Sequence, residues 1–109
     1  MKNISIADAI EMICELSKVL DDAYWEANSC DEKDQIYNLA SILNTEFIEI
    51  SKMSVQDHHF EYEVISVSKE ALKQALILFQ QLVPEYIRRQ TTRIRLNDLL
   101  HQLIVALTD

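Results

Sequence analysis

Apolar side chains recur at alternating spacings of three and four residues through the first half of the chain, which is the pattern of helices with one buried side. The first such stretch begins after Ser5, which has the spacing of an N-terminal capping box with Asp8. It ends at Asn28, a residue type that can take the left-handed conformation found after many helices. The second stretch runs from about Glu32 to Val55. The pattern therefore predicts two long helices.

A different pattern follows these helices. Between residues 56 and 68, Phe60, Tyr62 and Val64 alternate with glutamates, a period of two that is typical of extended backbone. A single strand has no sheet to join in a helical protein. We therefore expect an extended connector that lies along the helices with its aromatic side chains turned inward.

Helical spacing returns after the connector, between Leu72 and Val83. Pro84 follows, and it either kinks this helix or begins a new one, because a proline inside a helix removes one backbone hydrogen bond. The apolar stripe continues through Ile94, which favours a kink. The last helix is predicted near Ile94 to Leu107.

The chain of 109 residues contains no glycine and one proline. Tight β-hairpins and phosphate-binding loops rely on glycine, because it allows positive φ angles and close approach of the backbone to a ligand. Both are therefore disfavoured. Four helices with modest connections predict an all-α protein, an antiparallel up-and-down four-helix bundle that forms a single domain over residues 1–109.

The first two helices carry more apolar side chains than one buried side requires. About three-sevenths of each helix is buried in a helical bundle, so a second apolar row would leave a large exposed patch. A second copy of the chain, related by two-fold symmetry, would cover that patch. We therefore expect a homodimer, with the candidate interface residues Met12, Leu16, Val19, Ile42 and Ile48.

Charge is distributed unevenly along the chain, whose net charge is −8. Residues 1–70 contain 15 acidic residues and 5 lysines, a balance of −10, whereas residues 71–109 contain 3 acidic residues and 5 lysines and arginines, a balance of +2. An acidic majority argues against nucleic-acid binding, for which a basic surface is expected.

The sequence also bears on location. The longest apolar runs have five residues, far from the roughly 20 needed to cross a bilayer. The first ten residues lack the apolar core of a secretory signal. We therefore expect a cytoplasmic protein without membrane contacts, in which Cys14 and Cys30 are reduced thiols.

Four arginines lie within eight residues: Arg88, Arg89, Arg93 and Arg95. Guanidinium groups bind carboxylates and phosphates through paired hydrogen bonds, so this cluster is a candidate site for an anion or a protein partner. The alternative is that the arginines are solvated or pair with the acidic residues of the first two helices. The sequence leaves both interpretations open.

Arg95 and His101 enclose five residues in the segment RLNDLLH. This segment resembles the R-x(4–6)-H motif of the HEPN ribonucleases, small all-helical proteins that often dimerise. The resemblance implies RNA cleavage with Arg95 and His101 as the catalytic pair. Leu96 departs from the family, in which a polar residue usually follows the arginine. On one straight helix the two side chains lie about 120° apart, so they converge only if the helix begins between them or across a dimer.

Two pairs of glutamates offer a different chemistry. Glu11 with Glu15, and Glu46 with Glu49, are spaced to share helix faces. Two such helices side by side can hold Mg²⁺, an arrangement similar to that of the MazG-type nucleotide pyrophosphatases, although the denser glutamate motif of that family is absent. The alternative is that both pairs are solvated, and we expect no metal and no cofactor.

These features together favour a non-enzymatic protein–protein interaction module. We expect an adaptor-like or immunity-like homodimeric helical bundle, whose partners are a second copy of itself and another protein. An HEPN-like ribonuclease is the first alternative, and a Mg²⁺-dependent all-α nucleotide pyrophosphatase is the second.

Overall fold

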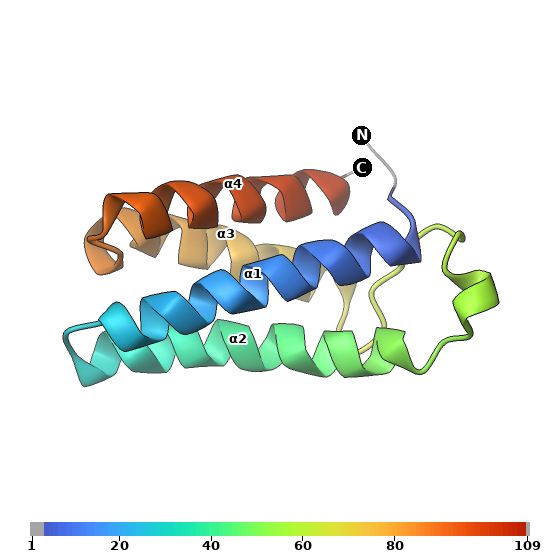
Figure 1. The fold of residues 1–109 in the computed structure, drawn as a ribbon, viewed down its shortest axis with the longest axis horizontal. Helices are drawn as coiled ribbons and strands as arrows, with labels where there is room; N and C mark the ends of the chain where they lie inside the picture. The colour runs from blue at the N-terminus through green and yellow to red at the C-terminus, as the bar shows by residue number, and fades with distance from the viewer. Residues whose placement is uncertain (1–3, 109) are drawn as a thin grey trace.

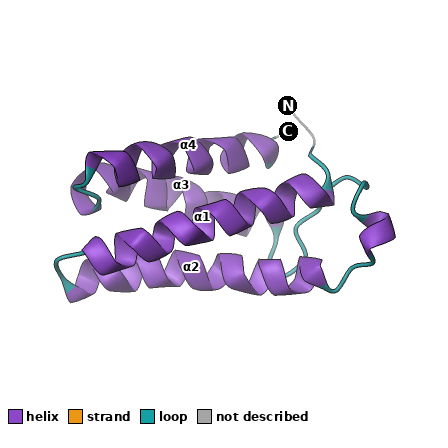
Figure 2. Ribbon diagram, in the orientation of Figure 1, coloured by secondary structure: helices purple, strands orange, loops and turns teal. Residues whose placement is uncertain are grey.

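The computed structural model describes residues 4–108, and the backbone within them is mostly helical, with one isolated β-bridge between Ser5 and Glu61. Figure 2 shows the helices and the loops that join them. The prediction of an all-α protein is confirmed. The elements are α1 (Ile6–Glu26), α2 (Cys30–Ser51), the 3-10 helix η1 (Val55–Asp57), α3 (Lys69–Tyr86) and α4 (Gln90–Ala106).

The four long helices lie side by side in a body of 42 × 26 × 23 Å. α1 and α3 each pack against both α2 and α4, so every long helix has two neighbours. Figure 1 shows that the short α1–α2 and α3–α4 connections share one end, here called the turn end. The long α2–α3 connection lies at the other end, the connector end, together with the start of α1 and the end of α4. None of the helices within residues 4–108 is both long and apolar enough to span a bilayer.

The core corrects part of the predicted dimer interface. Leu16 and Val19 are 0% and 1% exposed within the single chain, so they offer no surface to a second copy. The reason is that α1 packs against two helices, and two rows of apolar side chains are what two neighbours require. Among the other candidates, Met12 and Ile42 are half-buried and Ile48 is exposed.

Local sequence explains where α1 begins. The Ser5 hydroxyl accepts a hydrogen bond from the Asp8 amide at 3.1 Å, and the Asp8 carboxylate accepts one from the Ser5 amide at 3.5 Å. The predicted capping box is therefore confirmed. Two further donors at this helix start, the amides of Ile6 and Ala7, bond to carbonyl groups of the α2–α3 connection.

The α1–α2 connection differs from its prediction. No residue between 4 and 108 has a positive φ, so Asn28 is not left-handed. Instead Ala27 ends α1 in extended conformation, and the Asn28 amide donates to the Glu32 carboxylate at 3.0 Å. The side chain of Ser29 caps the first turn of α2 by accepting from the Glu32 amide. These two hydrogen bonds of Glu32 thus stabilise the change of chain direction without a left-handed residue.

The favoured prediction that one kinked helix continues past Pro84 to Ile94 is wrong. Pro84 lies in the last turn of α3, which ends at Tyr86, and α4 starts separately at Gln90. Between them Ile87 becomes extended and buries its side chain to 2% exposure. Burial of this one apolar residue in the core favours a break in the helix over a continuous stripe. Arg88 and the residue after it therefore lie in a loop.

The connector matches its prediction only in part. Tyr62 is buried and Val64 is half-buried, but Phe60 is 52% exposed. The carbonyl of Phe60 accepts from the Ile6 amide at 2.9 Å, and that of His58 accepts from the Ala7 amide at 3.0 Å. The connector thus uses its backbone to complete the first turn of α1, and this pairing turns the Phe60 ring outward.

Candidate functional site

Three of the four clustered arginines face carboxylates of α1 and α2 in the same chain. Arg88 lies 3.8 Å from Glu32, and Arg89 lies 3.4 Å from Glu26. Arg95 lies 3.7 Å from a third carboxylate, that of Glu15. The interpretation that the arginines pair with the acidic half of the chain is therefore the one that the contacts support.

The fourth arginine also turns inward toward its own chain. Arg93 is half-buried, and its guanidinium donates to the Ile87 carbonyl at 3.5 Å. Arg88 and Arg89 lie in the loop before α4, whereas Arg93 and Arg95 lie on α4 itself. The structure therefore does not gather the four predicted site residues around one shared point.

The contacts of Glu26 join the two connections at the turn end. Its carboxylate accepts a hydrogen bond from the Thr92 hydroxyl at 3.0 Å and another from Arg89 at 3.4 Å. Thr92 is only 7% exposed. Together with the pair between Arg95 and Glu15, these contacts bridge the part of the α1–α4 seam nearest the turn end, which we call the bridged half. A hollow of about 400 Å³ remains beside them.

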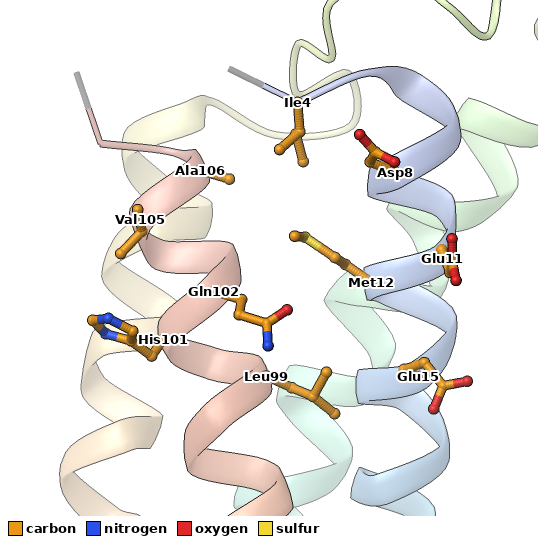
Figure 3. Close-up of a pocket in the computed structure, with 10 residues that line it drawn as sticks. All are labelled: Ile4, Asp8, Glu11, Met12, Glu15, Leu99, His101, Gln102, Val105 and Ala106. Atoms are coloured by element: carbon orange, nitrogen blue, oxygen red, sulfur yellow. The ribbon is translucent and has the colours of Figure 1, made fainter. Parts of the chain in front are cut away.

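The remainder of the same seam is open. A cavity of about 500 Å³ lies between α1 and α4 near the connector end. Figure 3 shows Met12 reaching from α1 toward α4, and Leu99 and Gln102 reaching from α4 toward α1. We call this site the open groove, and its lining residues are Ile4, Asp8, Glu11, Met12, Glu15, Leu99, His101, Gln102, Val105 and Ala106.

The two walls of the open groove differ in charge. Asp8, Glu11 and Glu15 follow one another along α1 at spacings of three and four residues (Figure 3), so they form one acidic rim. The facing wall on α4 presents His101, Gln102 and apolar side chains. Arg95 pairs with Glu15, but no lysine or arginine follows Arg95 in the sequence, so α4 supplies no permanent cation to Asp8 or Glu11. The result is an apolar cleft with an acidic edge.

A second exposed surface lies between α1 and α2 at the turn end. Trp25 is 73% exposed and Tyr37 is 63% exposed, and both line a hollow of about 480 Å³ with Tyr24. The Lys33 ammonium lies 4.5 Å from the centre of the Tyr24 ring and donates to the Tyr24 carbonyl at 2.7 Å. We call Trp25, Tyr37 and Tyr24 the aromatic patch.

The resemblance to HEPN ribonucleases meets a geometric obstacle within one chain. Arg95 and His101 both lie on α4, which begins before Arg95, at Gln90. The two side chains are therefore about 120° apart on one helix, and the first of the two conditions for convergence is not met. Arg95 faces Glu15 on α1, whereas His101 points away from α1 (Figure 3). Only a pairing across two chains would bring this motif together.

The two glutamate pairs have different surroundings. Glu11 is exposed and Glu15 pairs with Lys18 at 3.7 Å. Glu46, expected to be solvated or to bind metal, is 0% exposed, which corrects that expectation, while Glu49 pairs with Lys52. Among residues 4–108, no three His, Cys, Asp or Glu side chains gather closely enough to hold a metal ion.

Glu46 instead holds the connector in place. Its carboxylate accepts hydrogen bonds from the Tyr62 hydroxyl, from the Ile65 amide at 3.1 Å, and from the amide and hydroxyl of Ser66 at 2.8 and 2.6 Å. Burial alone would raise the pKa of Glu46, but these hydrogen bonds outweigh burial and hold its pKa below the ordinary value. Burial, together with the neighbouring Glu46 carboxylate, raises the pKa of Tyr62.

The sequence patterns missed the open groove, the aromatic patch and the role of Glu46. Exposed aromatic residues beside a polar run were the one available signal for the patch, whereas the groove depends on how α1 and α4 pack. No protein-family model, curated protein or solved structure matches the chain. The interpretation of the site therefore depends on its geometry alone.

Proposed function

We propose that this chain is a non-enzymatic protein–protein interaction module, adaptor-like or immunity-like, built as an antiparallel up-and-down four-helix bundle. The observation that carries the proposal is the open groove. It exposes Met12, Leu99 and Val105 beside an acidic rim, which is the combination of an apolar centre and a polar edge that protein interfaces use.

The state of the arginines supports the same function. Arg88, Arg89 and Arg95 each lie beside a carboxylate of their own chain, which lowers the positive potential that the cluster presents to RNA. The net charge of −8 also disfavours an RNA backbone as partner. A protein partner is therefore favoured over a nucleic acid.

Self-association is a separate part of the proposal. Its candidate interface is smaller than expected, because Leu16 and Val19 are buried within one chain. Met12, Ile42 and Ile48 are the candidate interface residues that keep some exposure. Sedimentation at micromolar concentration tests for the dimer, and Ile48→Asp is expected to shift the protein toward monomer. A wild-type protein that sediments as a monomer at every concentration would remove the homodimer and leave the groove unaffected.

The interaction function is tested by photo-crosslinking in a lysate of the cells that make the protein. A photoreactive residue placed at Gln102, in the open groove, is expected to give a discrete protein adduct. The matched control is the same residue at Gln81, an exposed position on α3. A further photoreactive residue at Tyr37 samples the aromatic patch. Absence of adducts from both Gln102 and Tyr37 would contradict the proposal. RNA degradation that His101→Ala abolishes would replace it with the ribonuclease.

A further inference from the structure

The shape of the open groove limits what can occupy it. It extends along α4 from Leu99 to Ala106 and along α1 from Glu15 to Asp8, with Ile4 at its end before the helix begins. At 1.5 Å per residue each helical wall is roughly 10 Å long, or about two helical turns. No free sheet edge exists among residues 4–108 to receive an extended strand. An amphipathic helix that inserts apolar side chains at successive turns fits a cleft of this length.

The charge of the groove limits the occupant further. Glu15 already has basic partners in Lys18 and Arg95. Glu11, in contrast, has no salt bridge within the described part of the chain, and the Asp8 carboxylate bonds only to the Ser5 amide there. The facing wall contributes no lysine or arginine. Complementary charge must therefore come from the occupant.

A second copy of this chain does not supply that charge. Two grooves facing each other across a two-fold axis would bring one acidic rim against the other, and like charges in contact oppose association. The arginines of α4 are already engaged near the turn end, where Arg95 pairs with Glu15. The occupant is therefore a different protein.

We infer that the open groove binds a basic amphipathic helix of a partner protein. Its apolar side chains contact Met12, Leu99 and Val105, and a flank of lysine or arginine lies along the rim formed by Asp8 and Glu11. This inference rests on the proposed interaction function and adds the class of ligand, its conformation and its orientation.

The probe is a fluorescein-labelled synthetic peptide of about 14 residues, roughly four helical turns. Leucines occupy one face at helical spacing, and lysines occupy one flank. We expect saturable binding by fluorescence anisotropy that weakens as salt increases, because the rim and the flank are exposed charges. A peptide with every lysine replaced by glutamate is expected to bind at least about tenfold more weakly. Equal binding of the two peptides would overturn the inference.

Two variants test whether the probe binds in the groove. Glu11→Lys reverses the rim charge and is expected to weaken binding about tenfold. Its control, Asp34→Lys, makes the same charge change at an exposed position near the turn end and is expected to change binding less than about threefold. Gln102→Trp fills the groove and is expected to abolish binding, whereas Gln81→Trp on α3 leaves it unchanged. Circular dichroism verifies that each variant folds.

The outcomes separate the inference from the function on which it rests. Wild-type affinity in both Glu11→Lys and Gln102→Trp would overturn the groove as the binding site. Loss of binding on replacing Trp25 or Tyr37 by serine, with groove variants unaffected, would move the site to the aromatic patch. A protein adduct at Gln102 without any peptide binding would leave the interaction function standing and reject the basic helix.

Discussion

The two halves of the α1–α4 seam are built from the same two helices but differ in how they are held. In the bridged half, Glu26 and Glu15 of α1 contact Thr92, Arg89 and Arg95. In the open groove, Asp8 and Glu11 continue the acidic side of α1, but no lysine or arginine follows Arg95 on α4. The difference indicates that charge placement along α4 decides where polar contacts bridge this seam and where they do not.

The largest effect on this comparison is expected from releasing the α2–α3 connection, which lies at the connector end beside the open groove. Glu46→Ala removes the acceptor for Tyr62, Ile65 and Ser66 and leaves their donors without partners in a buried place. We expect a loss of about 3–5 kcal/mol in the free energy of unfolding, measured by urea denaturation. The matched control is Glu49→Ala, one turn away, whose exposed pair with Lys52 is worth about 0.5 kcal/mol. Similar losses for both variants would contradict a special role for Glu46.

The pH dependence of stability sharpens the same point. The pKa of Glu46 is lower in the folded chain than the ordinary value of 4.5. Its contribution to stability is therefore present above pH 4.5 and is lost as pH falls through the folded pKa. We expect urea midpoints to decline in acid, and to decline less in Glu46→Gln, which cannot titrate. A decline of equal size in Glu46→Gln would assign the acid sensitivity to other carboxylates.

A smaller loss of stability is expected from a substitution in the bridged half. Thr92→Val keeps the shape of a buried side chain but removes the hydroxyl that donates to Glu26. We expect a loss of about 1 kcal/mol in the free energy of unfolding. Thr91→Val, at the exposed neighbouring position, is expected to have little effect. Thermal or urea unfolding distinguishes the two variants. Equal stability of both would show that the hydrogen bond from Thr92 to Glu26 does not stabilise the bridged half.

The smallest effect is expected for the ion pair at the boundary between the halves. The side chains of Arg95 and Glu15 are 54% and 44% exposed, and solvent screens such pairs strongly. Arg95→Ala should therefore cost about 0.5 kcal/mol or less at moderate salt. A loss several times larger would show that Arg95 contributes through packing as well as charge.

Local sequence predicted the helices well, because helical spacing and caps such as Ser5 with Asp8 depend on residues within a few positions of one another. It did not predict the break at Ile87, because burial in the core decided that conformation. The prediction that Leu16 lies in a dimer interface was also wrong, since the width of an apolar stripe does not reveal how many helices of the same chain cover it. Glu46 was missed because its hydrogen-bond partners lie 16 to 20 positions away.

The backbone pairing at the start of α1 has a consequence for the order in which the chain folds. The α1–α2 reversal needs only three residues, Ala27 to Ser29. The amides of Ile6 and Ala7, in contrast, donate hydrogen bonds to carbonyls 54 and 51 positions later in the chain. Short closures cost less chain entropy than long ones. As the chain emerges from the ribosome, we expect the α1–α2 reversal to form first and the open groove to acquire its final shape last, because α4, which forms one of its walls, is made after the other three helices.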